Sequence, residues 1–187
     1  MRRIVLASES PRRREILANT DINFTTKSVI TDEYIDPSLP LGDAIANVAL
    51  QKAKAVQPFV PHDVILGADT IVCIDGEILG KPHTKENAVA MLKKLSGKTH
   101  QVITGVAIIK EEKQDLFYEV SDVTFFPLSD EEIQAYVDTK EPLDKAGGYA
   151  IQGKGAIFVA KICGDYYNIV GLPIARCYRK LKDYIYD

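Results

Sequence analysis

An apolar run of eleven residues, VILGADTIVCI at positions 64–74, is the feature that most constrains the fold of this chain. Its length and its content of Ile, Val and Thr predict a buried strand. The Asp75-Gly76 pair that follows favours a two-residue hairpin turn, after which Glu77 to Leu79 would return antiparallel. The core is therefore expected to form around a sheet that contains this strand.

Helical patterns alternate with strands on both sides of this run. A short strand from Arg3 to Ala7 is followed by Ser10-Pro11, which supplies an N-cap and a first-turn proline for a helix reaching about Asn19. A second helix is expected over about residues 41–57. The other predicted elements are helices opened by Thr84, Ser129 and Pro173, strands over residues 101–110 and 115–126, and a hairpin of residues 156–162 and 166–170. This order predicts an α/β fold with a mixed sheet flanked by helices.

Composition limits the class of protein. The 187 residues contain no repeat and no Gly/Ser linker, so one domain over residues 1–187 is expected. A net charge of −3 argues against a nucleic-acid partner. The apolar stretch near the N-terminus is too short for a signal peptide or a membrane span, so we expect a cytoplasmic protein. Cys73, Cys163 and Cys177 are interpreted as buried thiols of a reducing compartment.

The segment LASESPRRREIL places three arginines in the first turns of a helix, where the helix dipole favours acidic residues instead. Backbone N–H groups at the helix start, together with Arg12 and Arg13, would make a cradle for phosphate, to which Ser8 could add a hydroxyl. A solvated basic turn capped by Ser10 explains the same pattern. The residues alone leave both interpretations open.

Asp69 is a carboxylate inside the apolar run. Burial of a carboxylate is costly unless it is paired, hydrogen-bonded or bound to a metal. Strand alternation would place Gly67 on the face of Asp69 and Thr70 on the opposite face, and Gly67 is expected to leave open space beside the carboxylate. An aspartate that caps a local turn is the alternative, but the apolar run resumes at Ile71, which favours a functional group.

Several other polar residues are weaker candidates. Lys52 lies on the apolar stripe of the second predicted helix and Lys81 lies in the turn LGKP, so each could bind phosphate. The acidic pair Asp32-Glu33 could help to hold a divalent cation. Snorkelling lysines, an ordinary turn and solvated loop charges explain these residues as well.

Gln152 lies at the end of the glycine-rich segment EPLDKAGGYAIQG, which suits the close approach of a ligand. Its amide offers a donor and an acceptor, as required to bind the edge of a pyrimidine. A glutamine bonded to its own backbone is the alternative. The three histidines are scattered without metal-ligand spacing, and neither GxGxxG nor a Walker loop occurs.

Taken together, six ordered segments resemble the Maf family of nucleoside triphosphate pyrophosphatases: LASESPRR, GADTIV, LGKP, SGKTHQVITGV, EPLDKAGGYAIQG and GDYYNIVGLP. The resemblance implies an elongated mixed β-sheet flanked by helices, with two lobes around a deep cleft, related in shape to the inosine triphosphate pyrophosphatases. It also implies a homodimer, a divalent cation (Mg²⁺ or Mn²⁺), and cleavage of a nucleoside triphosphate to the monophosphate and pyrophosphate.

The resemblance further assigns roles to single residues. Asp69 matches the family's proton acceptor, and Arg12, Thr70 and Gln152 match the specificity positions of the branch that acts on dTTP and UTP. The residues then expected to bind phosphate are Ser8, Arg12, Arg13, Lys52 and Lys81, and those expected to bind metal are Glu33 and Asp69. Modified pyrimidine nucleotides are a further substrate class. The alternative function is a non-enzymatic regulator of septum formation that acts through protein binding.

Overall fold

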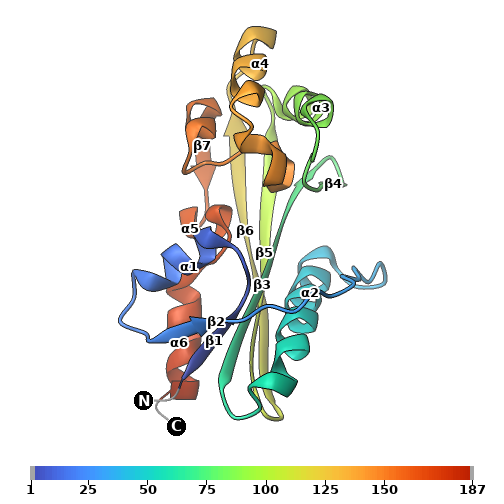
Figure 1. The fold of residues 1–187 in the computed structure, drawn as a ribbon. Coiled ribbons are helices and arrows are strands. Elements are labelled where there is room, and N and C mark those ends of the chain that lie inside the picture. The colour runs from blue at the N-terminus through green and yellow to red at the C-terminus, as the bar shows by residue number, and fades with distance from the viewer. Residues whose placement is uncertain (1–2, 186–187) are drawn as a thin grey trace. The chain divides into compact units, whose positions relative to one another are not determined.

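The computed structural model describes residues 3–185 and has a mixed seven-stranded sheet flanked by helices (Figure 1). The strands are β1 (Ile4–Ala7), β2 (Phe24–Thr26), β3 (Val64–Ile74), β4 (Glu77–Leu79), β5 (Thr99–Lys110), β6 (Lys113–Phe125) and β7 (Val159–Cys163). Their order is β2-β1-β3-β5-β6-β7, and β4 pairs with β3. The helices are α1 (Pro11–Ala18), α2 (Leu41–Val56), α3 (Lys85–Leu95), α4 (Asp130–Asp138), α5 (Tyr166–Val170) and α6 (Ile174–Ile185). The predicted α/β fold class, with a mixed sheet flanked by helices, is confirmed.

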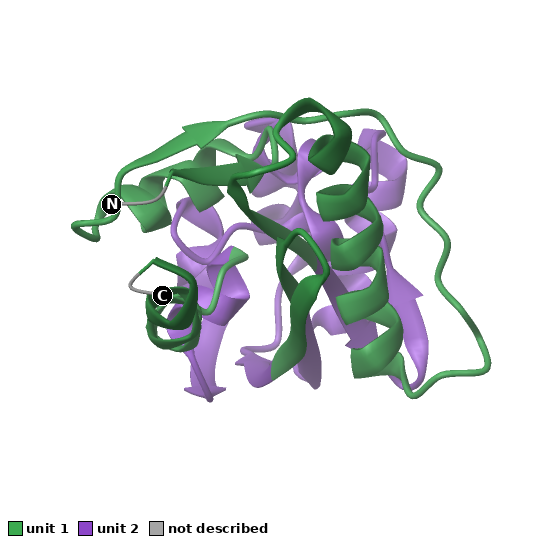
Figure 2. Cartoon of the chain, turned by 90° about the horizontal axis from the view of Figure 1, so that it is seen from below, with its two compact units in different colours: residues 1–69, 104–119, 171–187 green, residues 70–103, 120–170 purple. Residues whose placement is uncertain are grey.

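The chain divides into two compact units (Figure 2). Unit 1 comprises residues 1–69, 104–119 and 171–187, and unit 2 comprises residues 70–103 and 120–170. Both units are therefore assembled from segments that are distant in sequence. The expectation of one domain over residues 1–187 stays a prediction.

Unit 1 has a parallel core of three strands. β1 pairs in parallel with β2 on one side and with β3 on the other, with Leu6 opposite Thr26 and Ala7 opposite Gly67. Parallel neighbours need a crossover connection, and α1 and α2 lie in these connections. Because the carboxyl ends of parallel strands meet at one edge, Ser8 follows β1 at the level where β3 approaches Asp69.

Two glycines let the backbone of α2 lie directly on the sheet. A Cβ at Gly67 would be 2.3 Å from the carbonyl oxygen of Ala49, and one at Gly105 would be 2.3 Å from the backbone nitrogen of Ala46. The open space expected beside Asp69 at Gly67 is therefore wrong, because the helix backbone fills it. The close approach instead brings the next turn of α2, which carries Lys52, to the level of Asp69.

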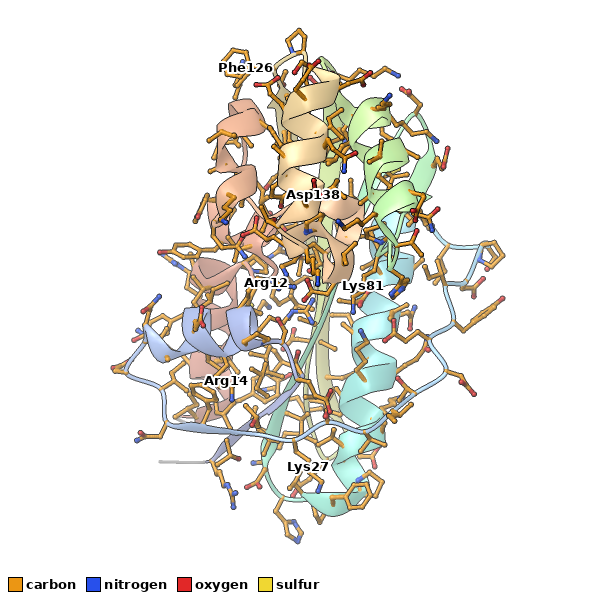
Figure 3. The ribbon with its side chains drawn as sticks, turned by 45° about the horizontal axis from the view of Figure 1, so that its top comes forward. Arg12, Arg14, Lys27, Lys81, Phe126 and Asp138 are labelled. Atoms are coloured by element: carbon orange, nitrogen blue, oxygen red, sulfur yellow. The ribbon has the colours of Figure 1, made fainter. Side chains whose placement is uncertain are left out.

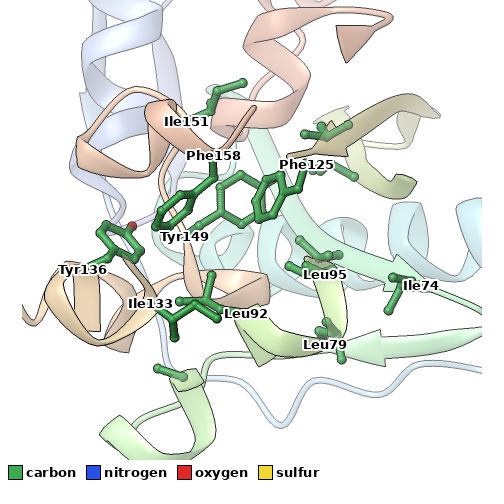
Figure 4. Packing of buried hydrophobic residues seen from close by; sticks show 14 of the residues in the cluster. Ile74, Leu79, Leu92, Leu95, Phe125, Ile133, Tyr136, Tyr149, Ile151 and Phe158 are labelled. Atoms are coloured by element: carbon green, nitrogen blue, oxygen red, sulfur yellow. The ribbon is translucent and has the colours of Figure 1, made fainter. Parts of the chain in front are cut away.

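Unit 2 is held by a hydrophobic cluster rich in aromatic rings (Figure 4). Phe125, Tyr149 and His100 pack edge to face, with ring centroids 4.8 to 5.4 Å apart. Tyr136 packs in the same way on Phe158. His100 is almost completely buried and hydrogen-bonds through Nε2 to the Tyr149 hydroxyl at 2.7 Å. The cluster thus fixes the backbone around Tyr149.

Most predicted elements are confirmed, with boundaries shifted by one or two residues. The Ser10 side chain accepts a hydrogen bond from the backbone of Arg13, and the capping box of Ser129 and Glu132 is formed. Membrane crossing would need a longer apolar helix than any found within residues 3–185.

The predicted hairpin of residues 156–162 and 166–170 is wrong. Only β7 is a strand there, since residues 154–158 form a 3-10 turn and residues 166–170 form α5. The carboxylate of Asp165 accepts a hydrogen bond from the backbone of Tyr167 at 2.7 Å, which favours a helical turn. The buried Asn168 amide then donates to the carbonyl of Val102 and to Ser121 Oγ. These distant contacts decide the local conformation.

One expectation about the cysteines is also corrected. Cys73 and Cys177 are buried and none of the three cysteines forms a disulfide, as predicted, but Cys163 is exposed at the end of β7. The apolar neighbours of Cys163 in the sequence therefore did not indicate burial, because β7 is mostly exposed.

Gly67→Ala is expected to lower the free energy of unfolding by about 1–3 kcal/mol, because the added methyl group would clash with the backbone of α2. Gly80→Ala is the matched control, since a Cβ there meets nothing within 4 Å. Urea denaturation measures both variants. Equal stability of the two would contradict close packing of α2 on β3.

Burial lowers the pKa of His100 from the ordinary 6.5 to about 4. Between these two pH values the unfolded chain binds a proton that the folded chain does not, so the free energy of unfolding should fall as the pH is lowered from about 6.5 to about 4, by ~3 kcal/mol in total. Denaturation across this range, compared with His100→Gln, measures the effect. Identical pH profiles for the two proteins would show that His100 does not cause it.

Candidate active site

The ammonium group of Lys52 lies between two carboxylates of unit 1. Its Nζ is 2.6 Å from Oδ1 of Asp69 and 2.9 Å from Oε1 of Glu33. The side chains of Lys52 and Asp69 are only 19% and 14% exposed, whereas that of Glu33 is 48% exposed. The buried carboxylate predicted at Asp69 thus has its partner, and three of the predicted site residues meet in one ion-pair cluster.

The start of α1 adds cationic and hydroxyl groups to unit 1. The Ser8 hydroxyl oxygen accepts a bond from the backbone of Ser10 at 3.2 Å and one from an Nη of Arg13 at 3.4 Å. Arg13 also donates from Nε to the carbonyl oxygen of Gly171 at 2.8 Å, which ties α1 to the segment that leads into α6. Arg13 therefore has a structural role, and its role in phosphate binding stays a prediction.

The pKa of Arg13 depends on its surroundings. Burial lowers the pKa of its guanidinium group, and the nearby Asp69 carboxylate acts in the opposite direction, as does Glu33 to a smaller extent. The neighbouring Arg12, which is half-buried, lowers the pKa further. Arginine stays protonated at neutral pH in spite of such shifts. Arg13 is thus close enough to the two carboxylates to belong to one electrostatic site with them, and Arg12 is close to Arg13.

The carboxylates of Glu33 and Asp69 are the candidate ligands for a divalent cation. Within residues 3–185 no group of three or more His, Cys, Asp or Glu side chains is arranged to hold a metal. Mg²⁺ is usually bound through one or two carboxylates, while waters and substrate phosphates supply its other ligands. Glu33 and Asp69 share one cation in the structure, so this pair of oxygen donors fits such an ion. The metal site at these residues stays a prediction.

The other predicted site residues belong to unit 2. Thr70 follows Asp69 within the unbroken strand β3, and Lys81 is exposed in the loop after β4 (Figure 3). Gln152 is exposed in a turn whose backbone is well anchored. The Tyr136 hydroxyl accepts a bond from the backbone of Ala150 at 3.0 Å. Gln152 is therefore available to a ligand while its loop is held by a buried contact.

Arg14 was not predicted as a site residue. It leaves α1 in a different direction from Arg12, as expected for residues two apart on a helix (Figure 3). It lines a pocket of about 260 Å³ together with Ser8, Glu9, Thr26, Lys27 and Ser28. The ends of β1 and β2 bring these polar residues together. The pocket was not predictable from the sequence, because its residues come from two separate segments.

The chain matches the family model described as Maf-like protein over residues 3–184. A protein named dTTP/UTP pyrophosphatase from Bacillus velezensis is 49% identical over 183 residues, which cover 98% of this chain and 97% of the relative. A protein of the same name from Bacillus mycoides is 54% identical over 187 residues, which cover 100% and 98% of the two chains. The similarity thus extends over nearly the whole of each protein.

Solved structures similar to this chain include two proteins of low sequence identity. The Ham1 protein of Staphylococcus aureus gives a TM-score of 0.43 at 14% identity, covering 66% of this chain and 71% of the other. A nucleoside-triphosphatase / dITP/XTP pyrophosphatase from Mycobacterium abscessus gives a TM-score of 0.45 at 12% identity, covering 83% and 93%.

Proposed function

This chain belongs to the Maf-like protein family, and we propose that it hydrolyses dTTP and UTP to the nucleoside monophosphate and pyrophosphate. The two Bacillus relatives carry this activity in their names and are 49% and 54% identical to the chain. Such an enzyme would remove these nucleotides, or modified pyrimidine nucleotides, from the cellular pool. The observation in the structure that best supports hydrolysis is the carboxylate of Asp69, held in a nearly buried ion pair.

Asp69 is the proposed proton acceptor. Lys52 holds Oδ1 of this carboxylate, so Oδ2 is the oxygen proposed to accept the proton of the attacking water. The oxygen of this water forms a bond to phosphorus as the anhydride bond between the α and β phosphates breaks, and the monophosphate and pyrophosphate leave. A carboxylate fixed in one orientation is suited to this task, because its position does not have to be reorganised during the reaction.

Cationic groups are required because the triphosphate and the two carboxylates have the same sign of charge. Arg12 and Arg13 are proposed to bind phosphate oxygens, and Ser8 to donate a hydrogen bond to one of them. Lys52 and Lys81 are proposed to neutralise the remaining charge. The existing bond from Arg13 to the carbonyl of Gly171 would keep its guanidinium group in a fixed orientation.

Glu33 and Asp69 would hold Mg²⁺ or Mn²⁺. When bound, such an ion lowers the pKa of a water ligand and stabilises charge on the phosphates. Residues of the chain supply the rest of the site: the carboxylates position the ion, and the arginines orient the substrate. Both carboxylates are now bonded to Lys52, which we propose turns to the phosphates when the substrate binds.

Arg12, Thr70 and Gln152 are proposed to select the substrate. The carboxamide of Gln152 can accept a bond from the N–H of a pyrimidine and donate one to the adjacent carbonyl. Its exposure and the anchored backbone of its loop support this role. The resemblance to the Maf family also supports the proposal of a homodimer. Three cysteines without a disulfide support the proposal of a cytoplasmic location, because the cytoplasm is a reducing compartment.

Asp69→Asn should reduce pyrophosphate release from dTTP in the presence of Mg²⁺ or Mn²⁺ by about 10² to 10⁴-fold, because the amide cannot accept the proton. Asp75→Asn, an exposed position just after the same strand, is the control and should remain active. A phosphate assay coupled to an inorganic pyrophosphatase measures both. Full activity of Asp69→Asn would refute the assignment, and an inactive wild-type protein would favour the non-enzymatic regulator of septum formation.

Gln152→Ala should reduce the preference for dTTP and UTP over purine triphosphates by about tenfold or more, since a lost polar contact costs binding of the matched base only. The ratio of kcat/KM for dTTP and dGTP measures the preference. Gln134→Ala, on the exposed face of α4, serves as the control. An unchanged ratio in Gln152→Ala would exclude Gln152 from base selection.

A further inference from the structure

Gln51 makes two hydrogen bonds to the backbone of a single residue in another segment. Its Oε1 accepts from the backbone nitrogen of Tyr34 at 3.0 Å, and its Nε2 donates to the carbonyl oxygen of Tyr34 at 2.8 Å. A side-chain amide thus satisfies both backbone groups of Tyr34, as a neighbouring β-strand would. Glu33, the proposed metal ligand, is the residue next to this contact.

The segment that carries Glu33 is anchored at its start, where Ser28 bonds to Glu9 and Val29 packs against a core cluster, but it has few contacts around Tyr34. Residues 27–36 have neither helical nor strand structure, and most of them are exposed. Ile30 is 99% exposed and Tyr34 is 61% exposed, so burial of apolar surface fixes neither of them. The two backbone bonds from Gln51 are therefore a main restraint on the position of Glu33.

α2 holds this segment with two consecutive side chains. Gln51 binds the backbone at Tyr34, and Lys52 binds the carboxylate of Glu33 at 2.9 Å. The same Lys52 reaches Asp69 on β3. The restrained segment is thus connected to Asp69 through Lys52.

We propose that Gln51 is a positioning residue that holds the backbone at Tyr34 so that Glu33 stays beside Asp69 as a ligand for a divalent cation. This inference rests on the proposed metal site of the pyrophosphatase. The two hydrogen bonds of Gln51 go to the backbone of Tyr34 and not to either carboxylate. Its effect on cation binding must therefore pass through Glu33.

Gln51→Met removes both hydrogen bonds and keeps the length and helix propensity of the side chain. Gln57→Met is the matched control, because Gln57 also donates from its amide to a backbone carbonyl in another segment of unit 1, that of Glu111 at 2.9 Å. Changing a residue that positions a metal ligand typically weakens metal binding by 10- to 100-fold. We therefore expect Gln51→Met to lower the affinity for Mn²⁺ by about tenfold. No loss is expected for Gln57→Met.

The test measures Mn²⁺ affinity by electron paramagnetic resonance without nucleotide, for the wild type, Gln51→Met, Glu33→Gln and the double variant. If Gln51 acts through Glu33, Gln51→Met weakens binding in the wild-type background and has no further effect in Glu33→Gln. If Gln51→Met lowers the Mn²⁺ affinity equally in the wild-type and Glu33→Gln backgrounds, Gln51 has a general structural role and the inference is overturned.

The remaining outcomes separate the inference from the proposed function. If Glu33→Gln weakens Mn²⁺ binding and Gln51→Met does not, the metal site stands and the positioning role of Gln51 is wrong. If Glu33→Gln has no effect, the proposed metal role of Glu33 fails and the inference fails with it. Hydrogen exchange at the amide of Tyr34 provides a second readout, since Gln51→Met should accelerate it and unchanged exchange would contradict the restraint.

Discussion

The ion pair of Lys52 with Asp69 and Glu33 is the interaction on which the site depends. An aspartate in an apolar strand would be costly without a counter-charge, and Lys52 supplies one at 2.6 Å. The same ammonium group holds Glu33 from a segment without regular structure. One cation therefore allows Asp69 to be charged within β3 and keeps a second carboxylate close to it.

The fold provides the position of this cation. Gly67 and Gly105 allow α2 to lie with its backbone against β3 and β5, and this close approach places Lys52 at the level of Asp69. Side chains at either glycine would push the helix away from the sheet. The register of β1 with β3 then brings Ser8 and the start of α1 to the same edge. Packing of small residues thus determines the geometry of charged ones.

The sequence predicted the features that depend on local patterns. β3, the turn after it and the caps of α1, α3 and α4 follow from periodicity and short-range hydrogen bonding, and the structure confirms them. Asp69 was detectable because it interrupts an apolar run. The helical stripe also indicated that Lys52 points toward the sheet.

Features that depend on distant contacts were not predictable in the same way. The helix α5 replaces a predicted strand because the buried Asn168 bonds to β5 and β6, and the space expected at Gly67 is filled by a helix from another part of the chain. The sequence did not indicate a role for Gln51, because a half-exposed glutamine on a helix is common. The partners of Lys52 likewise became visible only once α2 and the segment before it were in place.

We propose above all that Glu33 and Asp69 form a cation site, which Lys52 occupies in the free protein. The most direct test is the Mn²⁺ affinity of Lys52→Met in the absence of nucleotide, with Lys54→Met, an exposed lysine of the same helix, as control. Removing the competing ammonium group should tighten Mn²⁺ binding relative to the wild type and the control, because both carboxylates are then released. Equal or weaker binding by Lys52→Met would contradict the claim.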